Sequence, residues 1–327
     1  MFTTRLFGLL IACLALFPLP ARAVDKVSVA YFLEWPTANQ VAQIDRTYDE
    51  VLGVPVEWRA FSNGTEMTQA MIAGEVDIAY AQGFVPFVVG VSEGAPIKVV
   101  GVAVTYSDND ACIVRDDAGI TRDNAAELEG RKVATTLGNV THYKLLRSLD
   151  VLGVDASKVE LVEMNPAAAA VALVRGDVPM ACAFGGALER MKTVGRPLLT
   201  GAEQEAAGIS TYDVVSVTDA FAGENPELVR LFMAVTAQAD AAYKADPEKA
   251  YARLSRASGM ALQDMKSTLA GFRFPDIAEQ RSDKYLGGGL VADAKGIAKI
   301  MREAGNIERV LDDYSPFITD EFLPSAR

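Results

Sequence analysis

The stretch VELVEMNPAAAAVALVRGDVPMACAF, residues 159–184, decides the fold class. It holds two apolar runs of strand length, 159–164 and 178–184, on either side of a helical segment at 167–175. Two strands joined through a helix with short connections predict a parallel strand–helix–strand unit. Repetition of such units indicates an α/β fold, with helices covering both faces of mostly parallel sheets.

The same alternation continues on both sides of this stretch. Further strands are expected at 27–32, 54–59, 76–81, 97–104 and 132–136. Further helices are expected at 37–52, 65–73, 86–92 and 141–152. From about Asn225 the chain turns almost wholly helical, most clearly at 228–243, 247–258 and 292–304.

The two strand–helix runs lack a Pro/Ser-rich linker between them, so ordered strands should connect them. We expect one crossing near 110–115 and the return near 212–218. These crossings predict a lobe 1 of residues 24–112 plus 213–327 and a lobe 2 of residues 113–212. Two lobes joined by two strands leave a cleft between them that can close by hinge motion.

The first 23 residues have the pattern of a cleavable export signal. Arg5 precedes an apolar run at 6–17, and Ala21-Arg22-Ala23 predicts cleavage before Val24. The run is too short to span a bilayer of about 30 Å, which argues against a membrane anchor. The run also continues past Cys13, which argues against a lipoprotein. The sequence therefore predicts a periplasmic protein.

The 327-residue chain is half hydrophobic, enough for a sizeable core, and is strongly acidic. Its formal net charge is −12, and loss of the leader, with Arg5 and Arg22 and no acid, would leave −14. Such a charge disfavours nucleic acid and anionic membranes as partners. Because the overall charge repels anions, an anionic ligand would have to be held by hydrogen-bond donors close to it.

Cysteine and histidine usage argues against a metal site. Cys13 leaves with the leader, and Cys112 and Cys182 each lie in an apolar run, where a disulfide or two buried thiols are both possible. One His and no Cys-x-x-Cys make metal ligation improbable on composition alone.

Small ligands of α/β sheets bind beyond the carboxyl ends of the strands, so the residues that follow each strand are the candidates. After the first strand, Glu34 could receive a ligand cation or only favour a helix N-terminus, and Trp35 could wall the cleft or pack. In the loop Gln82-Gly83-Phe84-Val85, free N–H groups could hold an anion, or the loop could be an ordinary connection.

Lobe 2 and the return strand supply the other candidates. Asn139 or Thr141 can cap the helix that follows and can donate to an anion, whereas His142 lacks partners for catalysis and is interpreted as structural or as a neutral donor. Phe184 is followed by two glycines that open the cleft or form a turn. Asp213 is a lone acid in an apolar strand and needs a partner, either a ligand cation or an unidentified Lys or Arg.

At these residues the chain resembles the taurine-binding components of bacterial ABC importers, within the broader sulfonate-binding and thiamine-pyrimidine-precursor-like family. The resemblance covers essentially the whole chain after the leader. The matching stretches are Val29-Ala30-Tyr31, Val41-Ala42-Gln43, Val56-Glu57-Trp58-Arg59, Thr141-His142-Tyr143, Arg175-Gly176-Asp177, Asp213-Val214, and Asp313-Tyr314-Ser315 followed by Thr319-Asp320.

The resemblance implies a type II periplasmic binding protein, a monomer without cofactor or catalysis, that delivers its ligand to an ABC permease. It further implies that Thr141 and the loop 82–85 meet a sulfonate, and that Glu34 and Asp213 meet an ammonium. The family's Trp-Ala-Pro reads Phe184-Gly185-Gly186 here, and its double-Ser loop reads Gly83-Phe84-Val85. Hypotaurine or another sulfonate therefore stays open beside taurine. An enzyme of thiamine-pyrimidine type and a periplasmic sensor are the alternative functions.

Overall fold

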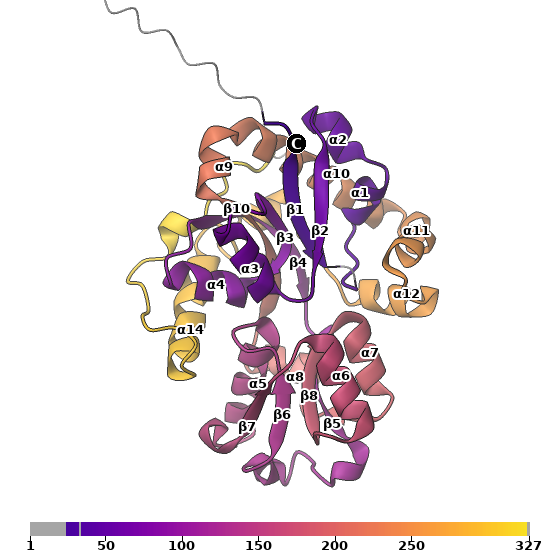
Figure 1. Ribbon diagram of the computed structural model, residues 1–327, viewed down its shortest axis with the longest axis vertical. Coiled ribbons are helices and arrows are strands. Elements are labelled where there is room, and N and C mark those ends of the chain that lie inside the picture. The colour runs from indigo at the N-terminus through magenta and orange to yellow at the C-terminus, as the bar shows by residue number, and fades with distance from the viewer. Residues whose placement is uncertain (1–23, 33, 326–327) are drawn as a thin grey trace, which may run out of the picture.

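A computed structural model describes residues 24–32 and 34–325 of the chain. The leader expected at 1–23 lies outside the described residues. The described chain forms two lobes, each built around a five-stranded mixed sheet with helices on its faces (Figure 1). The expected two-lobed α/β fold is confirmed.

The sheet of lobe 1 has the strand order β2-β1-β3-β10-β4. Its strands are β1 (Val27–Phe32), β2 (Val56–Phe61), β3 (Ile78–Gly83), β4 (Ile97–Tyr106) and β10 (Thr211–Thr218). The strand β10 runs antiparallel to the other four. The strands β1 and β3 are apolar almost throughout because helices cover both faces of the sheet.

The sheet of lobe 2 has the order β7-β6-β8-β5-β9. Its strands are β5 (Asp110–Arg115), β6 (Lys132–Thr135), β7 (Glu160–Glu163), β8 (Met180–Phe184) and β9 (Gly195–Pro197). Here β5 is the strand that runs against the others. Each sheet thus contains one reversed strand, and each reversed strand follows a crossing between the lobes.

Ten helices of the described chain belong to lobe 1 and four to lobe 2 (Figure 1). Lobe 1 carries α1 (Gln40–Ile44), α2 (Thr47–Leu52), α3 (Gly64–Ile72), α4 (Phe84–Ser92), α9 (Asp219–Glu224), α10 (Pro226–Ala245), α11 (Glu248–Ser258), α12 (Leu262–Ala270), α13 (Ile277–Arg281) and α14 (Gly289–Glu303). Lobe 2 carries α5 (Val140–Val151), α6 (Pro166–Arg175), α7 (Gly185–Lys192) and α8 (Gly201–Ala206). Short 3-10 helices lie at Asp116–Ala118, Ala125–Leu128, Ala156–Lys158 and Ser315–Phe317.

The single helix expected at 37–52 is two helices, α1 and α2. Arg46 between them has a left-handed backbone, with φ 59°, which ends the first helix despite the continuous apolar spacing. The glycines at 185 and 186, expected to open space in the cleft or form a turn, begin α7.

The crossings between the lobes lie slightly outside the expected strands. β5 pairs only within the sheet of lobe 2, and β10 only within that of lobe 1. The chain therefore crosses at 107–109 and returns just before Thr211. The expected boundaries at 112/113 and 212/213 fall inside these strands, which are whole members of one sheet each.

Cys112 and Cys182 form a disulfide, which decides between the two alternatives left open above. The two residues lie directly opposite each other in the antiparallel pair β5–β8. In the same register, two residues nearer the crossing, Asp110 lies opposite Phe184. Among residues 24–32 and 34–325, no helix has the length and apolarity needed to cross a membrane.

Candidate functional site

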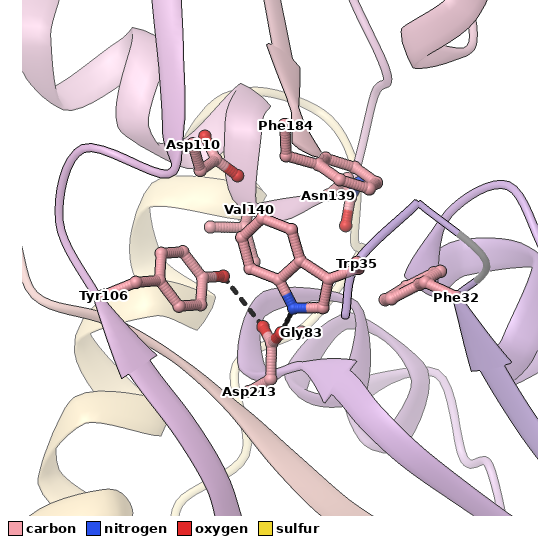
Figure 2. A pocket seen from close by; sticks show the side chains of 9 residues that line it. All are labelled: Phe32, Trp35, Gly83, Tyr106, Asp110, Asn139, Val140, Phe184 and Asp213. Atoms are coloured by element: carbon pink, nitrogen blue, oxygen red, sulfur yellow. Dashed lines mark hydrogen bonds between the residues drawn. The ribbon is translucent and has the colours of Figure 1, made fainter. Parts of the chain in front are cut away.

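A pocket lies between the two lobes, at the carboxyl ends of their parallel strands (Figure 2). Its lining residues are Phe32, Trp35, Gly83, Tyr106, Asp110, Asn139, Val140, Phe184 and Asp213. Its volume is about 240 Å³, which includes space open to solvent. The two lobes meet across it. For example, a Cβ on Gly83 of lobe 1 would lie 2.6 Å from Val140 Cγ2 of lobe 2.

Three helix N-termini converge on this pocket. Gly83, Asn139 and Phe184 are the N-cap residues of α4, α5 and α7, and none of them makes a side-chain cap hydrogen bond. Asn63 and Asn165 do cap α3 and α6, and neither of these two residues lines the pocket. Uncapped first-turn N–H groups carry partial positive charge, so three of them around one pocket favour an anionic group.

Aromatic rings form one wall of the pocket. The Trp35 ring meets Tyr106 at 4.9 Å and Phe184 at 5.5 Å between centroids, both edge-on, and Phe32 lies 5.5 Å from Phe184 (Figure 2). Faces of such rings attract a cation and exclude water from it.

Asp213 lies at the base of the pocket and is 2 % exposed. Its Oδ1 accepts a hydrogen bond from Tyr106 Oη at 2.8 Å, and its Oδ2 accepts one from Trp35 Nε1 at 2.8 Å (Figure 2). Burial raises the pKa of Asp213 well above its usual range, although both donors oppose the shift. In the described structure no Lys or Arg forms an ion pair with this carboxylate, so the salt bridge considered above is not found.

Asp110 is a second buried acid on the pocket, contributed by lobe 2. It is 2 % exposed, and its Oδ1 has no hydrogen-bond partner among the described residues. Burial raises the pKa of Asp110 to about 7, against the opposing charge of Lys144. Lys144 donates to the main-chain oxygens of Ser107 and Asp110 rather than to this carboxylate.

The reversed strands explain why both acids reach the pocket. Parallel strands end at the cleft, so the antiparallel strands β5 and β10 begin there. Asp110 is the first residue of β5 and Asp213 the third of β10.

Five of the residues predicted for the site line the pocket together: Trp35, Gly83, Asn139, Phe184 and Asp213. The rest of the loop 82–85 faces the interior of lobe 1. Gln82 donates to Thr68 and accepts from Ser216, and Phe84 stacks on Phe87. Val85 is buried too. The N-terminus of α4 reaches the pocket only through Gly83.

Thr141 and His142 lie behind the pocket wall. The Thr141 hydroxyl accepts a hydrogen bond from Thr135 Oγ1 at 3.4 Å, within lobe 2. His142 Nδ1 accepts from the Gly138 N–H at 3.2 Å, and its buried Nε2 has no partner among the described residues. Burial lowers the pKa of His142 to about 4, so the ring is neutral.

Glu34 does not line the pocket but forms an ion pair with an arginine of lobe 2. Its carboxylate lies on the rim and meets Arg190 of α7 at 3.4 Å. The side chain is about half exposed and does not line the pocket.

Sequence reasoning did not single out Phe32, Tyr106, Asp110 and Val140. Asp110 stands at the start of an apolar run, much as Asp213 stands within one, but it was interpreted only as part of a crossing. Tyr106 ends β4 at the same sheet edge. The contact of Val140 follows only from closure of the lobes.

The chemistry of this pocket suits binding. Its lining holds no thiol, imidazole or amine, and its two carboxylates belong to different lobes. Among the described residues no group of three His, Cys, Asp or Glu side chains could hold a metal ion. The arrangement can hold a small molecule with an anionic end at the helix N-termini and a cationic end at the acids.

Comparison with known sequences places these features in a family. Residues 41–250 match the family described as NMT1/THI5 like. The chain is 30% identical over 321 residues to the taurine-binding periplasmic protein of Escherichia coli K12, covering 96% of this chain and 97% of that protein. It is 25% identical over 207 residues to an aliphatic sulfonates-binding protein of the same organism, covering 63% of each chain.

Solved structures share the fold. The periplasmic aliphatic sulphonate binding protein of Escherichia coli superposes with a TM-score of 0.73 at 20% identity, over 90% of this chain and 98% of that chain. A desulfurization enzyme superposes with a TM-score of 0.63 at 16% identity, over 91% of this chain and 97% of that chain. The fold therefore serves both binding proteins and an enzyme. The chain belongs to the NMT1/THI5-like family and has the two-lobed α/β fold of periplasmic binding proteins.

Proposed function

We propose that this protein is a periplasmic solute-binding protein of an ABC importer, and that it captures taurine or a similar small aminosulfonate between its lobes. One observation carries the proposal: three uncapped helix N-termini and two buried carboxylates line the same pocket. A zwitterion satisfies both sets of groups at once.

The sulfonate is assigned to the N-termini of α4, α5 and α7. A sulfonate is ionised at every physiological pH and has three acceptor oxygens, so it needs several N–H donors and no proton exchange. Asn139 adds a side-chain amide at this end. The Thr141 hydroxyl bonds to Thr135 within lobe 2, so this assignment does not require Thr141 to contact the sulfonate.

The ammonium is assigned to Asp213 and Asp110, within the ring of Trp35, Tyr106 and Phe184. A buried carboxylate without a counterion is costly, and a ligand cation offsets that cost. Asp110 Oδ1, which has no hydrogen-bond partner among residues 24–32 and 34–325, is free to accept from the ammonium. Glu34 is not part of this assignment, because its carboxylate pairs with Arg190.

Transport is favoured over catalysis. The relatives compared by sequence are binding proteins, and the pocket lining lacks a nucleophile paired with a base. The disulfide supports an exported protein, because such bonds persist in oxidising compartments. In this proposal the protein captures its ligand as a monomer and delivers it to a membrane permease.

Calorimetric titration of the protein without residues 1–23 tests it. Taurine should bind with a stoichiometry of one and raise the melting temperature, because a ligand that binds only the native state stabilises it. Ethanesulfonate, which lacks the ammonium, should bind more weakly, and hypotaurine tests the anionic end. Absence of heat and of a melting shift with taurine at millimolar concentration would refute the assignment. Mass spectrometry of the recovered ligand tests the enzymatic alternative.

A further inference from the structure

Outside the aromatic wall, a segment of lobe 1 meets a segment of lobe 2. Trp35 contacts Phe184 in the wall itself (Figure 2). One residue further along, Gly185 has φ 56°, and a Cβ there would lie 2.2 Å from the main-chain oxygen of Glu34. Only glycine fits this close approach between the lobes.

The Glu34 carboxylate lies against the first turn of α7. A Cβ on Gly186 would lie 2.6 Å from Glu34 Oε2, so the second glycine makes room for this carboxylate. The N-terminus of a helix stabilises a negative charge in this position.

Arg190, one turn along α7, completes the contact. Its Nη2 lies 3.4 Å and its Nη1 3.5 Å from Glu34 Oε2. Asp264 of α12 lines the same outer groove, so lobe 1 offers Arg190 a second acid. Glu189 also lines the groove but already pairs with Lys192 at 2.8 Å within lobe 2.

We propose that Glu34, Gly185, Gly186 and Arg190 form a clasp that holds the lobes closed over the pocket, and that Glu34 sets the lifetime of the closed state without touching the ligand. The ligand named in the test rests on the proposed function, whereas the clasp itself rests on contacts between the lobes.

The clasp exists only when the lobes meet, because its carboxylate and its guanidinium belong to different lobes. Removing either charge should therefore destabilise the closed form and speed ligand release, with little effect on association. The ion pair is half exposed, so the expected change is modest, about two- to fivefold in the dissociation rate.

The first experiment chases labelled taurine from the protein with excess unlabelled taurine. Glu34→Gln and Arg190→Gln should each release taurine about two- to fivefold faster, and the double variant no faster than the worse single variant. Lys192→Gln is the matched control, because its ion pair stays within lobe 2. Ethanesulfonate should show the same fold change as taurine. A change confined to taurine would mean that Glu34 contacts the ammonium and would overturn the clasp, as would unchanged release.

The second experiment needs no ligand. Small-angle scattering of the ligand-free protein in an Asp110→Asn background, where the two buried acids do not repel each other on closure, should give a larger radius of gyration for Glu34→Gln and Arg190→Gln than for the Asp110→Asn parent and Lys192→Gln. Equal radii in all four proteins would overturn the clasp. If the wild type fails to bind taurine, the proposed function fails, and the scattering result alone decides the clasp.

Discussion

Asp110 and Asp213 face one pocket from opposite lobes, and the negative charge of Asp110 contributes to the raised pKa of Asp213. Closure therefore brings two buried carboxylates together, which is unfavourable unless a proton or a cation accompanies them. A ligand ammonium would relieve this repulsion in the closed state only. Such differential interaction is what lets a ligand shift a protein toward one conformation.

The first prediction concerns ligand choice. Asp213→Asn and Asp110→Asn should each weaken taurine binding by about 1.5–3 kcal/mol, the usual value of a charge-assisted hydrogen bond. Ethanesulfonate has no cation, so its affinity should stay within about threefold of wild type or improve as the repulsion falls. Titration calorimetry with both ligands measures the difference. Equal losses for the two would contradict the assignment of the acids to the ammonium.

The second prediction concerns pH. Burial raises the pKa of Asp110 to about 7, so below that pH the free pocket carries a proton that an ammonium must displace. Taurine affinity should thus rise as pH increases toward about 7, and Asp213, whose pKa burial also raises, should add to the rise. Titrations in buffers of different ionisation enthalpy should detect proton release near pH 6. Asp110→Asn should reduce the slope, and a slope unchanged from wild type in the variant would exclude Asp110 as a source.

The third prediction concerns a buried acid that does not line the pocket. Asp240 of α10 is 6 % exposed, its Oδ1 has no partner among the described residues, and burial raises its pKa to about 8. The folded protein then keeps a proton that the unfolded chain releases, so stability should fall as pH rises from about 4 to about 8. Asp240→Asn should remove this loss and gain roughly 3 kcal/mol at neutral pH.

Urea unfolding at several pH values measures this effect. Asp246→Asn, at the exposed end of the same helix, is the control and should keep the wild-type slope. An Asp240→Asn protein that is less stable than wild type at neutral pH would show that the carboxylate has a role the structure does not reveal.

The fourth prediction concerns the disulfide. It closes a loop with a sequence separation of 70, for which chain entropy predicts a stabilisation of about 4 kcal/mol. Because Asp110 and Phe184 lie opposite each other two residues along the same pair of strands, Cys112→Ala/Cys182→Ala should also weaken taurine binding. Reduction of the wild type should reproduce both losses. Reduction that lowers stability but leaves affinity unchanged would limit the disulfide to a structural role.

The sequence was most informative where local chemistry conflicts with its surroundings. Asp213 stood out because a lone acid in an apolar strand needs a partner, and the structure places it in the pocket. Gly83, Asn139 and Phe184 were found because they follow parallel strands, whose ends share one sheet edge. The same rules applied to Asp110, but its position became clear only once β5 was seen to run antiparallel.

Contacts between the lobes could not be predicted from local patterns. Glu34 and Arg190 are 156 residues apart, and no local pattern in either segment predicts that they pair. Thr141 was selected as a helix-capping donor, yet its hydroxyl bonds to Thr135, because the side chain direction at the start of α5 is set by packing within lobe 2. The pocket forms only where the two lobes meet, and local sequence patterns do not predict how they meet.

The last prediction concerns side-chain size at the interface between the lobes, and whether the lobes still close when one side chain is enlarged. A Cβ on Gly83 would lie 2.6 Å from Val140 Cγ2, across the lobe interface, so Gly83→Ala should hold the lobes apart and weaken taurine binding at least about tenfold. Gly83 has φ −57°, which alanine adopts freely, so backbone strain does not explain such a loss. Val140→Ala removes the opposing methyl and should leave affinity within about fivefold of wild type, because it deletes only part of one pocket wall. Gly83→Ala/Val140→Ala should then recover most of the affinity lost in Gly83→Ala, since the contact that blocked closure is gone. Titration of the four proteins completes the cycle, and strictly additive losses would show that the two residues do not meet when the ligand is bound.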